Sequence, residues 1–361
     1  SAGAYTDSVA ARVTDWGLAA LVVGLVASGA LTLFAGSPGD AWVFAAHDAL
    51  AGALALLLII KLRRVWPRVA AAARWDRRTI VGVLAVVLAL GALASGVLWA
   101  SGVTPALAGY GLLAWHDALG AVLVLAVAVH MVLRAKPLRG RDLAHRRQFL
   151  VAAGVSLGAL AAWRSQRPLE ALFGLRGAKR RFTGSYEAGS FTGNAFPTTS
   201  WVADHPRPFD IGRYRLRVEG LAAHPLALTL GQLAADEELV ATLDCTGGFY
   251  STQRWRGVRL GRILALAGPA PSARHVSVES QTGYRWSFAL DDARDLLLAT
   301  HVGGEPLSHD HGAPVRLIVP GARGFQWVKW VERVNLLEHP DYAAPASTVW
   351  SSFRSAGGPR R

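Results

Sequence analysis

Three histidines lie within the long apolar runs of this 361-residue sequence, and two of them belong to a repeated motif. The first copy is His47-Asp48-Ala49-Leu50 and the second is His116-Asp117-Ala118-Leu119. Two imidazoles presented at one depth by facing helices can ligate a planar haem iron from both sides. Alternatively, each histidine is a polar residue near a membrane interface, satisfied by its neighbouring aspartate or by water. The repeat favours a haem b with His47 and His116 as axial ligands.

A third histidine, His130, follows His116 by 14 residues. This spacing returns to nearly the same face of a helix, about 21 Å further along. Residues 10–135 thereby resemble the four-helix cytochrome b subunits of formate dehydrogenases and hydrogenases. The resemblance implies two haems, the second held by His130 and by a histidine of the first helix. No histidine precedes His47, and Asp15 and Trp16 stand at that depth instead. We therefore predict one haem, and a second haem on His130 stays open.

The single cysteine, Cys245, lies in the segment Leu243-Asp244-Cys245-Thr246-Gly247-Gly248-Phe249-Tyr250. One cysteine excludes an intrachain disulfide and a multi-thiolate zinc site. Lone cysteines are most often small buried hydrophobic residues. The glycine-rich turn after Cys245, however, indicates that the backbone approaches another group closely.

Residues 190–345 resemble the molybdopterin-binding domain of the sulfite oxidase family, which includes periplasmic methionine-sulfoxide reductases. Besides the cysteine turn, the motifs that carry the resemblance are Phe191-Thr192-Gly193-Asn194, Trp255-Arg256-Gly257-Val258-Arg259-Leu260, Gly283-Tyr284-Arg285, the run 311–321 that begins His311-Gly312-Ala313-Pro314-Val315-Arg316, and Gly324-Phe325-Gln326-Trp327-Val328-Lys329-Trp330. The resemblance implies an α+β fold, a molybdopterin cofactor and oxygen-atom transfer on a small-molecule substrate.

The same resemblance assigns roles to individual residues. Cys245 would supply the thiolate ligand of molybdenum, in keeping with the affinity of soft metals for sulfur. His311, Arg316 and Lys329 would surround the pterin phosphate through charge-assisted hydrogen bonds. Asn194 would lie near the metal or the pterin.

The substrate pocket departs from that of animal sulfite oxidases, which carry an arginine shortly after the cysteine. Tyr250 stands five residues after Cys245, and Arg254 is near but out of register. Both are candidates for the catalytic pocket. The missing arginine favours reduction of an S-oxide or N-oxide. Oxidation of sulfite or a related substrate is the alternative, as is a non-catalytic membrane binding protein or an electron shuttle for a separate reductase.

Five apolar runs must position the histidines, at residues 17–35, 43–60, 79–100, 112–133 and 148–163. The first four are each about 18 to 22 residues long, enough to cross a hydrocarbon layer about 30 Å thick. One such run would suit a buried core helix, but four in series indicate a bilayer-embedded protein. The fold class predicted is an N-terminal all-α transmembrane bundle of four helices plus a fifth anchor helix, followed by an α+β molybdopterin-binding domain.

Lysine and arginine gather in two loops, 61–78 and 134–147, whereas the loops around 37–40 and 101–111 have none. The positive-inside rule places the basic loops and the N-terminus in the cytoplasm, and a fifth crossing sends the C-terminal domain outside. The net charge of +13 thus reports topology, and nucleic acid is not a predicted partner. Arg146 and Arg147, preceded by His145, resemble an internal twin-arginine export signal.

The predicted organisation has four parts. Residues 1–140 form the cytochrome b-like domain, 141–165 the fifth helix with the twin-arginine signal, 166–190 a linker, and 191–361 the extracytoplasmic domain. Within the last part, strands are predicted at 214–218, 275–278 and 315–319 and short helices at 228–239 and 291–298. The function predicted is a molybdenum oxidoreductase of a prokaryotic cell membrane, exchanging electrons through haem b with quinone or a redox partner.

Overall fold

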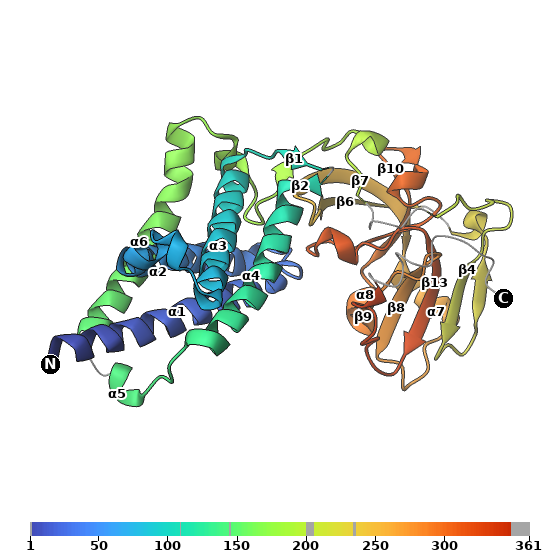
Figure 1. The fold of residues 1–361 in the computed structure, drawn as a ribbon. Helices are drawn as coiled ribbons and strands as arrows, with labels where there is room; N and C mark the ends of the chain where they lie inside the picture. Colours follow the sequence, from blue (N-terminus) through green and yellow to red (C-terminus); the bar gives the residue numbers. More distant parts are fainter. Residues whose placement is uncertain (1, 109, 144–145, 200–205, 234–235, 348–361) are drawn as a thin grey trace. The chain divides into compact units, whose positions relative to one another are not determined.

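The computed structural model describes residues 2–108, 110–143, 146–199, 206–233 and 236–347. His145 of the twin-arginine motif lies outside these residues. The chain divides into two compact units, residues 1–184 and 185–361. The first is built from helices and the second mainly from strands (Figure 1).

Long helices make up the N-terminal unit (Figure 1). They are α1 (Ala2–Thr32), α2 (Ala41–Val69), α3 (Arg77–Ser101), α4 (Leu112–Arg134) and α6 (Arg146–Leu172), with the short α5 (Gly140–Leu143) and the two-residue strands β1 (Ala106–Leu107) and β2 (Tyr110–Gly111) between them. Among the described residues, four helices are long and apolar enough to cross a membrane, and these are α1 to α4. The predicted fifth crossing corresponds to α6, which has Arg164, Arg167 and Glu170 in its C-terminal third and is not one of those four.

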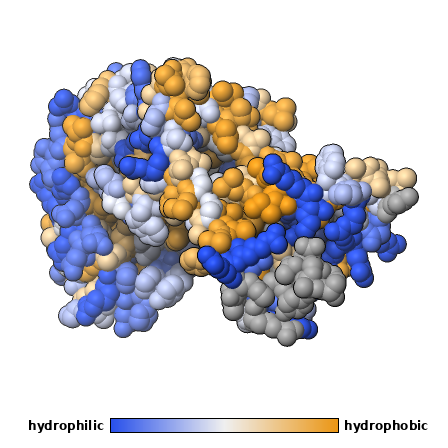
Figure 2. Space-filling model, turned by 90° about the vertical axis from the view of Figure 1, so that its left-hand side faces the viewer, coloured by the Kyte–Doolittle hydropathy of each residue, from blue (hydrophilic) through white to orange (hydrophobic). Residues whose placement is uncertain are grey.

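The bundle packs as two helical hairpins, α1 on α2 and α3 on α4, with α1 also against α4 and α6 against α2. Its core holds Leu18, Val22, Leu54, Leu58, Ala89 and Leu123. Many large apolar side chains point outward instead, for example Val132, which is 87% exposed, and Figure 2 shows broad apolar areas on the face it presents. An apolar exterior of this kind is what contact with lipid requires.

The segment predicted as a linker is folded onto the bundle. Helix α6 continues to Leu172, and beyond it Arg180 forms a largely buried ion pair with Glu170, N to O 2.7 Å. The Arg180 guanidinium also donates to the carbonyl of Ala100 at 2.8 Å, and the Trp99 indole donates to the carbonyl of Gly184. These contacts attach residues 172–184 to the end of α3, and the boundary between the two compact units, after Gly184, falls inside the predicted linker.

Two sheets form the C-terminal unit. The six-stranded sheet has the order β11-β10-β7-β3, with β12 pairing with β10 and β6 with β7, and the five-stranded sheet has the order β5-β4-β13-β8-β9. The strands are β3 (Tyr186–Glu187), β4 (Leu216–Gly220), β5 (Leu226–Leu228), β6 (Glu237–Asp244), β7 (Phe249–Arg259), β8 (His275–Ser280), β9 (Arg285–Ala289), β10 (Leu297–Val302), β11 (Glu305–Pro306), β12 (Arg316–Ile318) and β13 (Val331–Leu337). Two helices, α7 (Leu260–Ala267) and α8 (Leu290–Ala293), complete the unit.

The three predicted strands are confirmed as β4, β8 and β12. The predicted helix at 228–239 is reduced to a single 3-10 turn at Leu230–Gln232, because β5 ends at Leu228 and β6 begins at Glu237. Alternate residues of β6, such as Ala241 and Leu243, are buried, which is strand rather than helix periodicity. The predicted helix at 291–298 is reduced to the single turn of α8, after which Leu297 starts β10.

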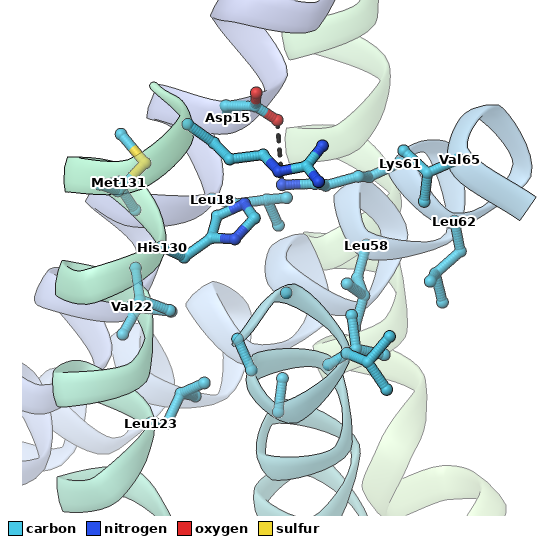
Figure 3. Close-up of a pocket in the computed structure, with 18 of the residues that line it drawn as sticks. Asp15, Leu18, Val22, Leu58, Lys61, Leu62, Val65, Leu123, His130 and Met131 are labelled. Atoms are coloured by element: carbon cyan, nitrogen blue, oxygen red, sulfur yellow. Dashed lines mark ion pairs between the residues drawn. The ribbon is translucent and has the colours of Figure 1, made fainter. Parts of the chain in front are cut away.

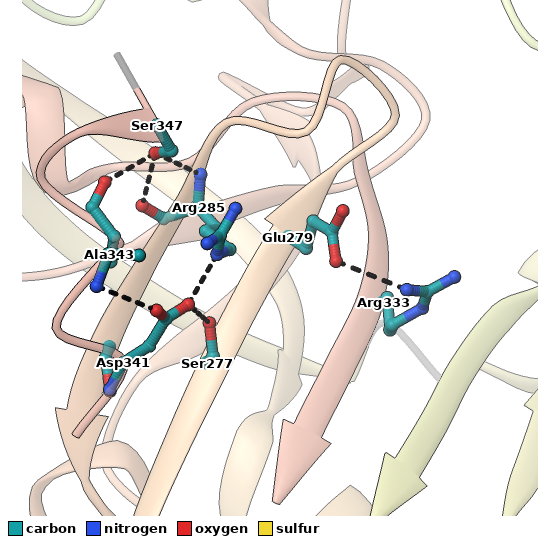
Figure 4. A network of polar contacts seen from close by, with 9 residues as sticks. Ser277, Glu279, Arg285, Arg333, Asp341, Ala343 and Ser347 are labelled. Carbon is teal, nitrogen blue, oxygen red and sulfur yellow. Dashed lines mark hydrogen bonds and ion pairs between the residues drawn. The ribbon is translucent and has the colours of Figure 1, made fainter. Parts of the chain in front are cut away.

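The segment that follows β13 is fastened to the second sheet by polar contacts (Figure 4). Asp341 forms an ion pair with Arg285 of β9 and accepts a hydrogen bond from the backbone of Ala343. The Ser347 hydroxyl accepts from the backbone N–H of Arg285 at 3.1 Å and donates to its carbonyl at 3.2 Å. Residues 341–347 are thereby held against β9.

Candidate molybdopterin site and histidine pair

Cys245 lies in the wall of a small, partly open cavity in the C-terminal unit. Segments distant in the sequence meet there: 196–199, the β6–β7 hairpin, β12 and the stretch 324–329. The cavity is lined by Phe196, Pro197, Thr198, Thr199, Leu243, Cys245, Phe249, Arg316, Gly324, Trp327 and Lys329. Of the residues predicted from the sequence, the fold thus brings Cys245, Arg316 and Lys329 to one cavity.

The cysteine is presented by the tight hairpin between β6 and β7. The N–H of Cys245 donates to the carbonyl of Phe249 at 2.8 Å, and the N–H of Gly248 donates back to the Cys245 carbonyl at 3.0 Å. Gly248 has a φ of +94°, which favours glycine. The N–H of Gly247 donates to Cys245 Sγ at 3.3 Å, a contact that stabilises a thiolate.

A buried ion pair supports the base of this turn. Asp244, directly before Cys245, accepts from Arg323 at 2.6 Å, and both side chains are almost fully buried. Ser185 also donates to Asp244, at 2.7 Å. The pair joins the cysteine hairpin to the segment that carries Gly324, where an added Cβ would lie 3.0 Å from the Cys245 Cα.

We expect Asp244→Asn to lower the stability of the C-terminal unit by about 3 kcal/mol, because it leaves the buried Arg323 without its counter-charge. The matched control is Asp236→Asn, which breaks the ion pair between Asp236 and Arg262. Both side chains of that pair are more than half exposed. Exposed pairs contribute less than about 1 kcal/mol. Thermal unfolding of the two variants measures the difference, and equal shifts in Tm would contradict the structural role of Asp244.

Arg316 is a buried guanidinium within the cavity wall. It lies beside the rings of Trp255 and Trp327, at 5.6 and 5.9 Å from their centroids, and donates to the His311 carbonyl at 3.1 Å. Burial lowers its pKa to about 10, and the nearby Cys245 partly opposes this shift. In the part of the chain that the structure describes, no carboxylate pairs with Arg316, and its Nε has no hydrogen-bond partner. A buried cation in this state calls for an anionic ligand.

His311 and Lys329 approach this region from neighbouring loops. His311 is buried, with Nδ1 2.7 Å from the Ser308 hydroxyl and Nε2 3.0 Å from the Phe196 carbonyl, and it does not itself line the cavity. Lys329 does line it and donates to the carbonyls of Thr199 and Asp310. Arg316 and Lys329 thus bring two basic side chains to the cavity, with the buried His311 next to Arg316.

The pKa of His311 is lowered to about 4, first by burial and then by the charge of Arg316. The unfolded ring protonates near pH 6.5 and the folded ring only near 4, so the unfolded state binds more protons between these values. Acidification across this window is therefore expected to destabilise the cofactor-free protein by up to about 3 kcal/mol. Unfolding measured at pH 7.5 and 5 should show a smaller pH effect in His311→Asn. An unchanged pH effect would count against this explanation.

The other three predicted residues lie elsewhere. Asn194 donates to the carbonyl of Pro306 and accepts from the backbone of Ser308, so its amide holds the loop after β11. Tyr250 and Arg254 do not line the cavity. Their even-numbered positions on β7 face away from the buried Ser251, Gln253 and Trp255. The Arg254 side chain is 59% exposed and pairs with Glu238.

The cavity residues that sequence reasoning did not single out as site residues include Thr198, Thr199 and Trp327. Trp327 belongs to a family motif, which was the available signal. The two threonines follow the Phe191–Asn194 motif by only a few residues, but nothing in their type or spacing indicates a site. Only the approach of this segment to Lys329 places them there.

A second candidate site lies in the helical unit, where α2 and α4 bring His47 and His116 together. Their ring centres are 6.2 Å apart. A metal–imidazole bond of about 2.0 Å, with about 1.1 Å from nitrogen to ring centre, separates two rings on one ion by about 6.2 Å. Nδ1 of His47 lies 2.9 Å from the Ser28 hydroxyl, and Nδ1 of His116 lies 3.1 Å from that of Ser95. With each Nδ1 beside a serine hydroxyl, Nε2 is the nitrogen that would ligate a metal ion, and the separation of the ring centres is compatible with a bis-histidine site.

Comparison with known proteins shows which family the C-terminal unit resembles. Residues 203–344 match a family described as "Oxidoreductase molybdopterin binding domain". The protein-methionine-sulfoxide reductase catalytic subunit MsrP of Gluconobacter oxydans (strain 621H) is 30% identical over 230 residues, which cover 55% of this chain and 72% of that protein. The mitochondrial sulfite oxidase of Mus musculus is 35% identical over 164 residues, covering 36% of this chain and 30% of that protein.

The NAD(P)H nitrate reductase of Hordeum vulgare is also similar, 35% identical over 161 residues, which cover 35% of this chain and 18% of that protein. The chain thus spans less than a third of the sulfite oxidase and of the nitrate reductase. The matched region contains the Cys245 turn, the buried Arg316 and Lys329. The chain belongs to the molybdopterin-binding oxidoreductase family that includes MsrP and sulfite oxidase.

Proposed function

We propose that this protein is a membrane-bound molybdenum oxidoreductase that transfers an oxygen atom to or from a small extracytoplasmic substrate, with electrons carried by a bis-histidine haem b. The observation that carries the proposal is the cavity shared by Cys245 and the buried Arg316, which forms no ion pair with a carboxylate among the described residues. A thiolate and a cation without a counter-charge are what a metal dithiolene with an anionic tail requires.

Each residue around the cavity has a task toward that group. Molybdopterin, when bound, supplies a metal that exchanges an oxygen atom and two electrons with the substrate. Cys245 would hold the metal, and the Gly247 N–H would stabilise its thiolate. Arg316 and Lys329 would bind the phosphate, with His311 beside them. The Asp244–Arg323 pair keeps the cysteine turn in place.

We favour reduction of an S-oxide or N-oxide as the reaction. The position five after the cysteine is Tyr250 rather than arginine, and Arg254 lies on the exposed face of β7, so neither supplies the sulfite-binding cation. The MsrP relative, named a protein-methionine-sulfoxide reductase, supports the same direction. With a quinol as electron donor the reaction balances: one S-oxide and one quinol give one sulfide, one quinone and one water. Sulfite oxidation is the second candidate, favoured by the similarity to sulfite oxidase.

The haem would connect the molybdenum centre to the quinone pool or to a redox partner. The fit of the His47–His116 separation to one iron supports this part of the proposal. It also makes a non-catalytic binding role less suitable, because such a role requires no redox group. A bis-histidine haem accepts one electron at a time and so divides a two-electron reaction into single steps.

The proposed location is a prokaryotic cell membrane. Four helices suited to crossing it support this placement, as do the basic loops between them. With the N-terminus in the cytoplasm, α6 would be the fifth crossing and would bring the C-terminal unit outside. Arg146 and Arg147 at the start of α6 would then serve export through the twin-arginine route.

The full chain, purified from membranes, tests the proposal directly. We expect molybdenum and a b-type haem spectrum in the same preparation. Methionine sulfoxide added to dithionite-reduced protein should reoxidise the haem, whereas sulfite added to oxidised protein should leave it oxidised. Haem reduction by sulfite would support the second candidate, and a preparation without molybdenum would refute both.

A further inference from the structure

The helical unit contains an internal duplication that extends beyond the repeated histidine motif. In α1 the sequence Ala27-Ser28-Gly29 recurs in α3 as Ala94-Ser95-Gly96, an offset of 67 residues. The histidines of α2 and α4 are offset by 69. The hairpins α1–α2 and α3–α4 are therefore two copies of one unit.

The contacts within each hairpin repeat in the same way. Ser28 lies against His47 as Ser95 lies against His116. A Cβ added at Gly24 would meet Leu50 at 3.5 Å, and one added at Gly91 would meet Leu119 at 3.4 Å. The outer ends of the two hairpins have thus kept equivalent packing around the histidine pair.

The opposite, inner ends of the two hairpins have not kept equivalent packing. The offset of 69 pairs His130 of α4 with Lys61 of α2, and the offset of 67 pairs Gly82 of α3 with Asp15 of α1. In one hairpin Lys61 forms an ion pair with Asp15, N to O 3.0 Å. In the other, the His130 ring lies against Gly82, where an added Cβ would stand 3.1 Å from Cε1. The inner end therefore presents one histidine opposite an ion pair.

This asymmetry does not fit a second haem. Its remaining ligand would have to come from α1 or α2, and the groups that face His130 there are Asp15 and Lys61 (Figure 3). The carboxylate of Asp15 already binds the Lys61 ammonium, and Arg64 lies 3.6 Å from the same oxygen. A protonated, ion-paired lysine offers no lone pair to iron.

Instead, the inner end of the bundle contains a mainly apolar cavity that is partly open to its surroundings. Apolar side chains of all four helices form its walls, including Val22, Leu58, Val86 and Leu123. His130, Lys61 and Asp15 lie at one end of it (Figure 3). Nδ1 of His130 is buried and has no hydrogen-bond partner among the described residues.

We propose that this cavity binds the headgroup of a membrane quinol, with His130 Nδ1 hydrogen-bonded to one quinol hydroxyl and the isoprenoid tail along the apolar wall. The inference rests on the proposed function, because the electrons would pass to the haem between His47 and His116. His116 and His130 share one face of α4, and the core residues Val22, Leu54 and Leu123 lie between the two levels. An apolar site with a few polar groups at one end suits a ligand that is itself apolar with a polar ring.

The test uses the full chain in lipid nanodiscs, with a short-chain ubiquinol analogue as the probe. His130→Gln is expected to slow haem reduction by the quinol about 10- to 100-fold, since the glutamine amide corresponds in position to Nε2 and does not reproduce the hydrogen bond at Nδ1. Dithionite should still reduce the haem fully and with the same spectrum. Val132→Ala, on the exposed side of the same helix, is the matched control and should reduce at the wild-type rate.

Several results would overturn the proposal. One is a rate of haem reduction by quinol that is unchanged in His130→Gln. Another is a haem content that falls from two per chain in the wild type to one in His130→Gln, since that loss would make His130 a haem ligand. Phospholipid that copurifies with the wild type but not with His130→Gln, at equal quinol rates, would identify a lipid site. Photolabelling with an azidoquinone gives a readout independent of haem, and label absent from residues 123–134 would also refute the site. A wild-type protein without any haem would instead refute the proposed function.

Discussion

Cys245→Ser is expected to reduce substrate turnover by more than about 100-fold while leaving the haem spectrum intact. Loss of a group that merely supports a metal ligand costs about 10- to 100-fold, and Cys245 would be the protein's own ligand to molybdenum. A serine hydroxyl is a hard, weakly acidic donor and does not replace a thiolate. The haem should be unaffected, because His47 and His116 belong to the other compact unit.

Turnover is measured as reoxidation of the dithionite-reduced haem by methionine sulfoxide. The control is Thr252→Ser on β7, a residue whose side chain contacts Thr242 and not the cavity. Unchanged turnover in Cys245→Ser would show that the cavity is not the reaction site. It would also favour the alternative in which the chain only carries electrons to a separate reductase.

His116→Ala is expected to remove the b-type haem spectrum and to lower quinol-driven turnover at least about 10-fold. A haem b in the helical unit would have no covalent attachment to this chain, since the single cysteine lies in the other unit. Its retention would therefore depend on the two axial ligands and on packing. Turnover driven by a reduced viologen dye, which can donate directly to the molybdenum centre, should persist.

The matched control is Leu125→Ala, a substitution of a mostly exposed apolar side chain of the same helix. It should retain the haem and the quinol-driven turnover. A normal reduced spectrum in His116→Ala would exclude this histidine as a ligand. Loss of both quinol- and dye-driven turnover would indicate misfolding, which comparison of the molybdenum content detects.

The parts of the fold that were predictable are those specified by local pattern. A helix that crosses lipid must satisfy its backbone internally and present apolar side chains along its length, so α1 to α4 were visible as continuous runs. Strands such as β8 were visible as alternation. The helix predicted at 228–239 failed because apolar content without clear periodicity suits either element, and here sheet pairing with β7 decided the outcome.

Site residues divide in a similar way. Cys245, Arg316 and Lys329 belong to family motifs, and the cavity contains all three. Arg254 was a candidate because it is close to Cys245 along the chain, but side chains alternate across a strand. Arg254, nine residues after Cys245 along the hairpin, therefore lies on the exposed face of β7, where it pairs with Glu238. Proximity in sequence is a weak guide wherever the chain is extended.

The sequence by itself determined the chemistry available to this protein: one thiolate beside a glycine turn, a repeated histidine motif, and a set of motifs shared with an oxidoreductase family. The tertiary structure decided which of these groups meet. It placed the buried Arg316 next to Cys245 with no carboxylate partner in the described part of the chain, and it set the His47 and His116 rings 6.2 Å apart. It also placed Lys61 and Asp15 opposite His130. Such distances depend on how separate helices and strands pack, and no local pattern of residues encodes them.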